Sequence, residues 1–301
     1  MIKFKHLLYT VAVGTLLYAC GTDSNPRIEN FDHEAQAAKD KDTIAKFLKN
    51  YYFDDTVDSI KPMVSGKTPL LEDDRLIKKT HTENDIEYDL YHLIVKEGES
   101  PKGNPTQLDS VLTKYQVWYS TKADQLELSQ TGTEPIWWNL TQSGSRQDAP
   151  SPIRGWTYGI PNLKAGINVP TPGEPITYEN FGKGILIIPS GLAYRNTPNG
   201  GIPSNSQLIF YIDLLDFVVD TDHDNDGIPS IYEDLDEDGN PRNDDTDKNN
   251  VPNYLDIDDD GDGVLTKNED KNGDGDPRND FNDPNKPSVP DYLNRDIRVK
   301  Y

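Results

Sequence analysis

Apolar and polar residues alternate over 86–95, which predicts a β-strand with one buried face. Further short runs of β-branched and aromatic residues predict strands at 111–119, 136–140, 184–188 and 207–217. One short helix fits between Pro152 and Leu163. This order of elements predicts an α+β domain built on an antiparallel sheet.

A different pattern covers residues 31–52, where apolar side chains recur every three or four residues. The spacing predicts an amphipathic helix with the stripe Ile44, Phe47, Leu48, Tyr51 and Tyr52. Two interpretations stay open, because the stripe can pack on the domain of the same chain or dock on a partner protein. Residues 55–85 are mixed and give no clear pattern.

The first residues are typical of an export signal, with basic side chains before a short apolar run at 7–17. That run is too short to span a bilayer. It ends in Leu-Tyr-Ala-Cys20, which resembles the cleavage site of bacterial lipoproteins, where the cysteine receives the lipid. Cys20 is the only cysteine of the chain, so an intrachain disulfide is excluded. The alternative is a chance cysteine in a discarded signal.

The lipoprotein interpretation predicts an extracytoplasmic protein held at the cell envelope by lipid, with the outer membrane as the expected membrane. The small polar residues 21–30 then form the tether. The predicted parts of the chain are a signal peptide (1–19), a tether with a helical segment (20–85), a folded domain (86–218) and a C-terminal region (219–301).

Charge is distributed unevenly along the 301 residues, whose formal net charge is −22. Residues 220–291 contain 24 acidic and 6 basic residues and so carry most of this excess. A field of this sign repels phosphate backbones, which argues against nucleic-acid binding. It attracts divalent cations instead.

The acidic region contains two complete D-x-D-x-D-G-x5-E patterns, which supply oxygen ligands at the spacing of calcium loops. The first comprises Asp222, Asp224, Asp226 and Glu233, and the second Asp258, Asp260, Asp262 and Glu269. Weaker auxiliary patterns lie at Asp234, Asp236 and Asp238 and at Asp270, Asn272 and Asp274.

The segments between these loops also repeat, since 238–244 parallels 274–280 and 251–255 parallels 289–293. Prolines interrupt the region so often that the flanking helices of an EF-hand are not expected. The region is similar to thrombospondin type 3 repeats, in which calcium-filled loops wind a chain without a core. The alternative is a disordered acidic spacer.

Several motifs of the 86–218 segment resemble the FKBP-type peptidyl-prolyl isomerases. They are Pro-Ile-Arg-Gly-Trp at 152–156, Gly-Leu-Ala-Tyr at 191–194, Ile-Pro at 202–203 and the apolar strand from Leu208. The resemblance implies a curved antiparallel sheet wrapped on a short helix. It also implies a pocket for a proline ring with Trp156 as its floor and walls of Tyr115, Ile153 and Phe210. Tyr194 and the backbone N–H of Ile153 would donate hydrogen bonds to a substrate carbonyl, and Ile202 would close the rim.

The chain departs from the family pattern at three pocket positions. Leu126 and Glu127 stand where an aromatic residue and aspartate are usual, and Ile136 stands where phenylalanine is common. An insertion with three prolines follows the helix at 167–181. These departures predict lower catalytic efficiency more than a different fold. A purely structural role of the aromatic residues as core is the alternative.

Together these features predict a lipid-anchored isomerase that assists the folding of proline-containing exported polypeptides, with structural Ca²⁺ in the C-terminal region and no cofactor for catalysis. The competing hypothesis is a non-catalytic module that grips proline segments, or an adhesion module, on a calcium-stiffened spacer. The sequence has no phosphate-binding glycine loop and no nucleophile elbow, so it supports no other class of enzyme.

Overall fold

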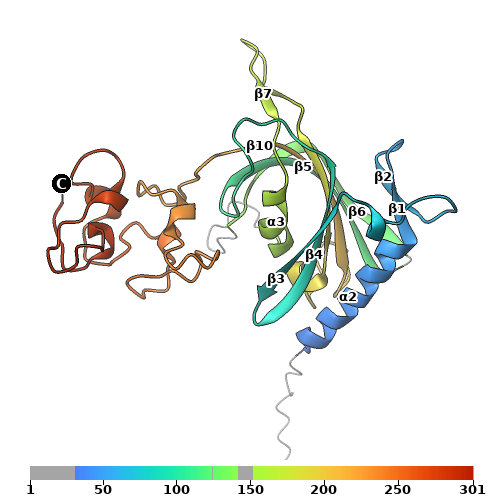
Figure 1. Ribbon diagram of the computed structural model, residues 1–301, viewed down its shortest axis with the longest axis horizontal. Helices are drawn as coiled ribbons and strands as arrows, with labels where there is room; N and C mark the ends of the chain where they lie inside the picture. The colour runs from blue at the N-terminus through green and yellow to red at the C-terminus, as the bar shows by residue number, and fades with distance from the viewer. Residues whose placement is uncertain (1–30, 124, 142–151, 301) are drawn as a thin grey trace, which may run out of the picture. The chain divides into compact units, whose positions relative to one another are not determined.

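The computed structural model describes residues 31–123, 125–141 and 152–300. Its centre is a six-stranded antiparallel sheet that curves around one short helix, α3 (Figure 1). The expected α+β class, with a curved antiparallel sheet on a short helix, is confirmed. In spatial order the strands are β3 (Leu76–Glu83), β4 (Ile86–Lys96), β9 (Gly182–Ile188), β10 (Gln207–Phe217), β5 (Ser110–Lys122) and β6 (Gln125–Asn139).

Both faces of the sheet are buried, which explains why strand β9 is apolar at successive positions. Successive side chains of a strand point to opposite faces. Leu186 and Ile188 face the inner cluster with α3 (Arg154–Gly159), whereas Ile185 and Ile187 face a second cluster on the outer side.

The outer cluster is covered by α2 (His33–Asn50), which contributes Ile44, Phe47 and Leu48 (Figure 1). Of the two interpretations of the amphipathic stripe, packing on the same chain is therefore confirmed. The helix ends earlier than the stripe predicts, because the next residues begin β1 (Tyr51–Asp54), which forms a hairpin with β2 (Ser59–Pro62). Aromatic residues favour strands, and here the pairing with β2 outweighs the helical spacing.

The segment without a clear pattern holds β2, a 3₁₀ turn at Leu70–Glu72 and the edge strand β3. The proline-containing insertion forms a small hairpin of β7 (Ile167–Val169) and β8 (Thr177–Glu179). Neither hairpin interrupts the central sheet, because each pairs only with itself.

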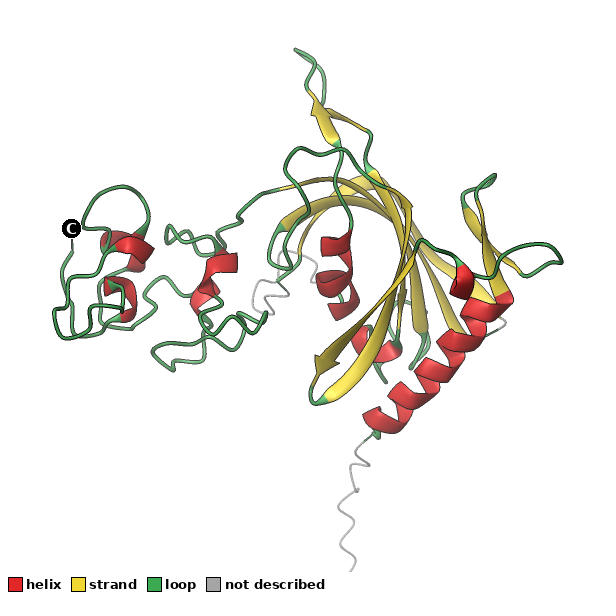
Figure 2. Ribbon diagram, viewed as in Figure 1, coloured by secondary structure: helices red, strands yellow, loops and turns green. Residues whose placement is uncertain are grey.

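Residues 219–300 contain no α-helix and no strand (Figure 2). They wind through turns with five short 3₁₀ segments at Ser230–Glu233, Asn253–Leu255, Thr266–Asn268, Pro277–Asn279 and Asp291–Leu293. Only Ile228, Tyr254 and Tyr292 are fully buried large apolar side chains here. A region with so few buried apolar groups needs another source of stability.

Candidate functional site

Six of the predicted pocket residues line one cleft of about 240 Å³ on the concave side of the sheet. They are Tyr115, Ile153, Trp156, Tyr194, Ile202 and Phe210. They come from β5, α3, the loop before β10 and β10 itself, and the most distant are 95 positions apart in sequence. The structure therefore assembles a single site from separate motifs.

Two glycines on α3 explain how Trp156 reaches this position. A Cβ atom added to Gly155 would lie 2.4 Å from Cγ2 of Ile188, and one added to Gly159 would lie 2.5 Å from Cδ1 of Leu186. Both distances are far below van der Waals contact, so only glycine lets the helix sit this close to β9. Trp156, between the two glycines, is 2% exposed and turns its ring toward the cleft.

The aromatic rings around Trp156 form an edge-to-face cluster. Its ring centroid lies 5.4 Å from that of Tyr115, 5.2 Å from Phe210 and 5.2 Å from Trp138, with interplanar angles of 85°, 82° and 63°. Such arrangements fix the orientation of each ring. The cleft is therefore a rigid apolar box that matches a small apolar ring.

Polar groups at the cleft can donate hydrogen bonds but carry no charge. Burial, and to a lesser degree the neighbouring Tyr115, raises the pKa of Tyr194, so its phenol stays protonated at neutral pH and can donate. Among the described residues, no partner accepts a hydrogen bond from the Tyr194 hydroxyl or from the backbone N–H of Ile153. Both donors are available to a carbonyl group in the cleft.

The placement expected for the three departing positions is wrong. Leu126 packs on the outer cluster, and Glu127 lies opposite Tyr119, whose hydroxyl donates to its carboxylate at 2.6 Å. Ile136 pairs with Thr113 and is 38% exposed. None of the three lines the cleft. The physical reason is the register of β6, which bulges at several points against β5.

Three lining residues of β6 were missed by the sequence reasoning. Trp138 lines the cleft whereas Ile136 does not, and Ser129 and Gln130 line it whereas Leu126 and Glu127 do not. The shift between Val117 and Trp118 in the pairing with β6 leaves Ser129 as the extra residue. The adjacent Trp137-Trp138 pair was the available signal, because the alternation of a strand sends only one of them inward.

The acidic region repeats one turn geometry. In each predicted loop the first aspartate accepts a hydrogen bond from the backbone N–H of the glycine five residues later, at 2.7–3.2 Å. These glycines, at 227, 239, 263 and 275, all have positive φ. A fifth turn has the same bond, from Asn250 N–H to Asp245 at 2.9 Å, although asparagine replaces glycine and hid it from the pattern.

Carboxylates converge within these turns as cation ligands would. Oxygens of Asp222, Asp224 and Asp226 all lie within 4.8 Å of one another, and the same holds for Asp258, Asp260 and Asp262 and for the auxiliary Asp234, Asp236 and Asp238. The auxiliary Asp270, Asn272 and Asp274 share the turn but do not form such a group of acidic side chains among the described residues.

A further group joins the two main loops. Asp226 and Glu233 of the first loop converge with Asp259, and all three are at most 1% exposed. Asp259 was not predicted as a ligand because it occupies a non-ligand position of its own loop. Both carboxylate oxygens of Glu233 lack a hydrogen-bond partner among the described residues. Burial first, and then Asp226 and Asp259, raise the pKa of Glu233 to about 11.

The second loop shows the same chemistry. Glu269 is 1% exposed with both oxygens unpartnered by described residues, and burial, then Asp260 and Asp262, raise its pKa to about 9. Buried unpaired carboxylates are costly, and a hard divalent cation is the partner that offsets this cost. The donor set, composed of carboxylate oxygens, fits Ca²⁺.

Comparisons with known proteins bear on both regions. The chain is 34% identical over 121 residues to FkpA, an FKBP-type peptidyl-prolyl cis-trans isomerase of Escherichia coli K12, and equally to FkpA of Escherichia coli O157:H7. The match covers 40% of this chain and 33% of FkpA, so the chain spans about a third of the length of these curated relatives. Part of this chain is homologous to the FKBP-type isomerases.

Solved structures similar to this chain include two isomerases. A peptidyl-prolyl cis-trans isomerase from Pseudomonas syringae pv. tomato matches with 18% identity, 65% coverage of this chain, 98% coverage of its own and a TM-score of 0.35. FkpA from Escherichia coli matches with 20% identity, 72% and 73% coverage and a TM-score of 0.34. In the acidic region, residues 223–291 match the family described as BamM C-terminal.

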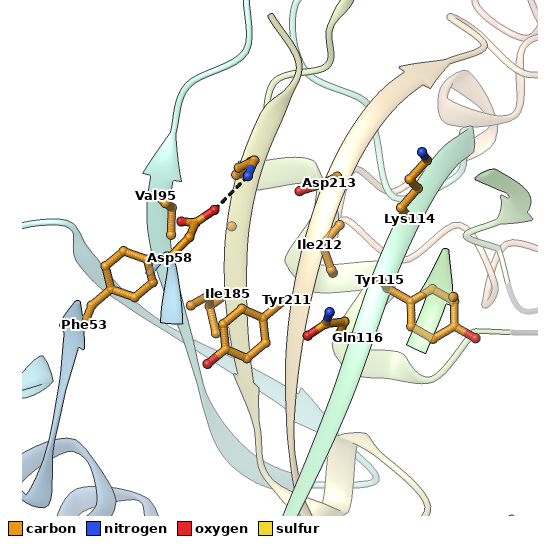
Figure 3. A pocket seen from close by; sticks show the side chains of 13 residues that line it. Phe53, Asp58, Val95, Lys114, Tyr115, Gln116, Ile185, Tyr211, Ile212 and Asp213 are labelled. Carbon is orange, nitrogen blue, oxygen red and sulfur yellow. Dashed lines mark hydrogen bonds and ion pairs between the residues drawn. The ribbon is translucent and has the colours of Figure 1, made fainter. Parts of the chain in front are cut away.

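A second cleft of about 300 Å³ lies beside the β1–β2 hairpin (Figure 3). Its lining mixes apolar side chains with polar and charged ones, the latter including Lys114, Gln116 and Asp213 on the sheet and an ion pair of 2.7 Å between Lys183 and Asp58. Figure 3 shows Gln116 and Tyr115 on opposite sides of β5. The homology to isomerases favours the aromatic cleft as the candidate site, because an apolar lining suits a proline ring. The charged groups of the second cleft do not.

The acidic region is joined to the FKBP-like domain by several contacts. The ring of His223 lies 2.6 Å from the carbonyl oxygen of Leu108, and Arg242 contacts Glu83 and the hydroxyl of Tyr158 at 3.7 and 3.2 Å. Glu83 also pairs with Arg154, the residue after Ile153, at 3.2 Å. Arg242 of the acidic region thus contacts Tyr158 of α3 and also Glu83, the ion-pair partner of Arg154.

Cys20 and the signal segment lie outside the described residues. Within the part of the chain that the structure covers, no helix combines the length and apolar character that a membrane span requires. The lipoprotein interpretation stays a prediction.

Proposed function

We propose that this chain is a peptidyl-prolyl cis-trans isomerase of the FKBP type. The observation that carries the proposal is the aromatic cleft, in which Trp156, Tyr115 and Phe210 surround a space next to the hydroxyl of Tyr194. The sequence match to FkpA supports the same conclusion.

The cleft suits the chemistry of proline isomerisation. The barrier of about 18–20 kcal/mol arises because the amide loses resonance as it twists. An apolar box holds the proline ring while the preceding carbonyl leaves water, and a phenol or backbone N–H then binds that oxygen in the twisted geometry. No nucleophile or titrating group is needed, which agrees with the uncharged lining.

The direct test is turnover of short X-Pro peptides by the purified mature chain, followed by a conformation-specific protease or by exchange NMR. Catalysed exchange that saturates with peptide is expected. If the chain binds proline peptides without accelerating exchange, the non-catalytic proline-binding module takes the place of the isomerase. Among the residues that the structure describes, no acidic side chain lines the cleft, and this observation favours that alternative.

For the acidic region we propose structural Ca²⁺. The buried, unpartnered carboxylates of Glu233 and Glu269 and the shared turn geometry support it. Similarity to thrombospondin type 3 repeats remains part of this proposal. The ions would stabilise the turns and take no part in catalysis.

We further propose a lipid-anchored protein at the cell envelope, with proline-containing exported polypeptides as substrates. The Leu-Tyr-Ala-Cys20 motif and the polar tether support the anchor. An extracytoplasmic location also agrees with calcium binding, because calcium is far more available there than in the cytosol.

Replacing Tyr194 with phenylalanine is expected to lower kcat/KM by up to about tenfold, because one hydrogen bond to the substrate is worth about 0.5–1.5 kcal/mol. Stopped-flow peptide assays measure it. Tyr178→Phe, on the β7–β8 hairpin away from the cleft, is the matched control. An unchanged kcat/KM for Tyr194→Phe would remove the hydroxyl from the site.

Replacing Cys20 with serine is expected to leave an unprocessed or soluble protein, because no other residue at this junction can accept a thioether-linked lipid. Fractionation of membranes, with the precursor and mature sizes resolved on a gel, decides the outcome. A variant that is still processed normally and stays in the membrane fraction would exclude the lipid anchor.

A further inference from the structure

One charged residue lies among the buried residues of α2. Its apolar members, Ile44, Phe47 and Leu48, cover the outer face of the sheet as an amphipathic helix requires. Asp40 is equally buried, with 0% exposure. Packing does not explain a carboxylate in this position, since burying a charge without compensation is costly.

Two of the three hydrogen-bond partners of Asp40 lie far away in sequence. One carboxylate oxygen accepts the backbone N–H of Ser190 at 2.7 Å, and the other accepts Nε2 of Gln207 at 2.7 Å. Gln36, one turn earlier on α2, donates a third bond at 2.8 Å. Hydrogen bonds to an ionised acceptor are stronger than neutral ones, so this carboxylate is a firm anchor.

The two distant partners mark the ends of one loop. Ser190 stands two residues after the end of β9, and Gln207 is the first residue of β10. The loop between them carries four residues that line the aromatic cleft, namely Tyr194, Asn199, Gly200 and Ile202. A single carboxylate on α2 thus holds both ends of the loop that closes the cleft.

Backbone hydrogen bonds extend this anchor toward Tyr194. Arg195 donates its N–H to the carbonyl of Ser190 at 2.9 Å, and its own carbonyl accepts the N–H of Asn205 at 2.7 Å. The two arms of the loop are therefore joined beside Tyr194. Ser190 and Gln207 are 1% and 4% exposed, so water cannot readily take over the role of Asp40.

The packing under the loop is close as well. A Cβ atom added to Gly191 would lie 2.0 Å from Cε1 of Tyr88, so the loop rests directly on that ring. Van der Waals contact resists approach but does not hold the loop down. The hydrogen bonds to Asp40 supply the directional part of the attachment.

We propose that Asp40 is a positioning residue for the isomerase site, which sets the places of Tyr194 and Ile202 by holding both ends of the 190–207 loop. This inference rests on the proposed function. It makes α2, which lies outside the FKBP-like segment, part of the machinery of the cleft.

The first test compares Asp40→Ala with Asp42→Asn, which removes an exposed carboxylate from the same helix. In Asp40→Ala, the hydroxyl of Tyr194 and the side chain of Ile202 are expected to be displaced. This displacement is expected to lower kcat/KM by about tenfold to a hundredfold, with a raised KM and a lowered kcat. Asp42→Asn is expected to match the parent. A folded Asp40→Ala protein with parental kcat and KM would overturn the proposal, even if its melting temperature is lower.

A rescue variant separates positioning from general stability. In Asp40→Asn, the oxygen that accepts from Gln207 is replaced by an NH₂ group. Two donors, this NH₂ group and Nε2 of Gln207, then face each other and cannot form a hydrogen bond. Adding Gln207→Glu restores a complementary pair with the donor and acceptor exchanged, while Gln36 can turn its amide. The double variant is expected to recover most of the kcat/KM lost by Asp40→Asn. No recovery, with both proteins folded, counts against the proposal.

A double-mutant cycle links Asp40 to the cleft. If Asp40 acts through Tyr194, the effect of Tyr194→Phe nearly vanishes when Asp40 is already alanine. Additive effects would show that the two residues act independently and would overturn the proposal. If Asp40→Ala does not fold, Gln207→Met replaces it in the cycle. This variant removes only one of the two hydrogen bonds that hold the ends of the loop to Asp40.

Amide hydrogen exchange tests the role of Asp40 independently of the proposed isomerase activity. Faster exchange confined to residues 190–206 is expected in Asp40→Ala, whether or not the parent isomerises peptides. A parent without activity together with a loosened loop would refute the isomerase alone. An active parent whose loop exchanges at the same rate in Asp40→Ala would refute the role of Asp40 alone.

Discussion

Trp156→Ala is expected to abolish measurable isomerase activity, a loss of about a hundredfold or more in kcat/KM, together with binding of proline peptides. The change removes the floor of the cleft and the ring that contacts Tyr115, Trp138 and Phe210 edge-to-face. A hundredfold loss in kcat/KM corresponds to about 2.7 kcal/mol of lost transition-state stabilisation, because each 1.4 kcal/mol or so is a factor of ten in rate. Peptide turnover and fluorescence titration with a proline peptide measure the two effects.

Trp137→Ala is the matched control, because Trp137 is the neighbour of Trp138 on β6 but is 46% exposed. It is expected to keep full activity. The buried position of Trp156 makes some loss of stability unavoidable, so Trp156→Leu, which keeps an apolar side chain, is assayed beside it with circular dichroism as a check of folding. A folded Trp156 variant that isomerises peptides at the parental rate would show that the site lies elsewhere.

Removal of calcium is expected to unfold residues 220–294 while the FKBP-like domain stays folded. The negative charges of the many acidic residues repel one another, and the few buried apolar side chains are not enough to offset that repulsion. Binding then supplies the folding free energy. Limited proteolysis and small-angle scattering of the mature chain, with millimolar calcium or with chelator, are expected to show a compact, protected region only with calcium.

Glu233→Gln tests the first loop without changing side-chain shape, and Glu237→Gln, at an exposed position in the same segment, is its control. The double change Asp224→Ala with Asp260→Ala is expected to remove most of the protection. Magnesium is expected to substitute poorly, because it demands a tighter octahedral shell and dehydrates reluctantly. Equal protease sensitivity with and without calcium would leave only a solvated acidic spacer.

The pH dependence of this region follows from the same carboxylates. Burial raises the pKa of Asp224 to about 8, of Asp259 to about 9 and of Asp260 to about 7. In the folded, calcium-free state the region would therefore bind more protons than the unfolded chain, so the stability of that state falls as pH rises from about 4 toward 9, which is one reason why the region is expected to unfold without calcium at neutral pH. In that unfolded state the carboxylates titrate near pH 4, and calcium needs them deprotonated, so calcium affinity is expected to fall as the pH drops from about 5 toward 4, where binding releases protons. Calorimetry in two buffers of different ionisation enthalpy measures this release.

The residue types of the cleft could be predicted because their signals are local. Gly155-Trp156 and Leu192-Ala193-Tyr194 occur in short motifs, and each motif folds with its own element. The acidic turns were predictable for the same reason, since the spacing of the aspartates and the glycine of the turn lie within a few residues of one another. The strands 86–95 and 207–217 were found through their apolar character and needed no partner to be recognised.

The sequence by itself thus determined the α+β class, most of the aromatic residues of the cleft and the acidic turns. Only the tertiary structure decided which residues of β6 reach the cleft, because Trp138 lines it whereas Ile136, two residues earlier on the same face of the strand, does not and is 38% exposed. It also brought Asp259 to Glu233, 26 positions away, and Asp40 to Ser190, 150 positions away. A buried carboxylate has no local pattern, because its place is set by donors or ligands that folding brings from distant segments.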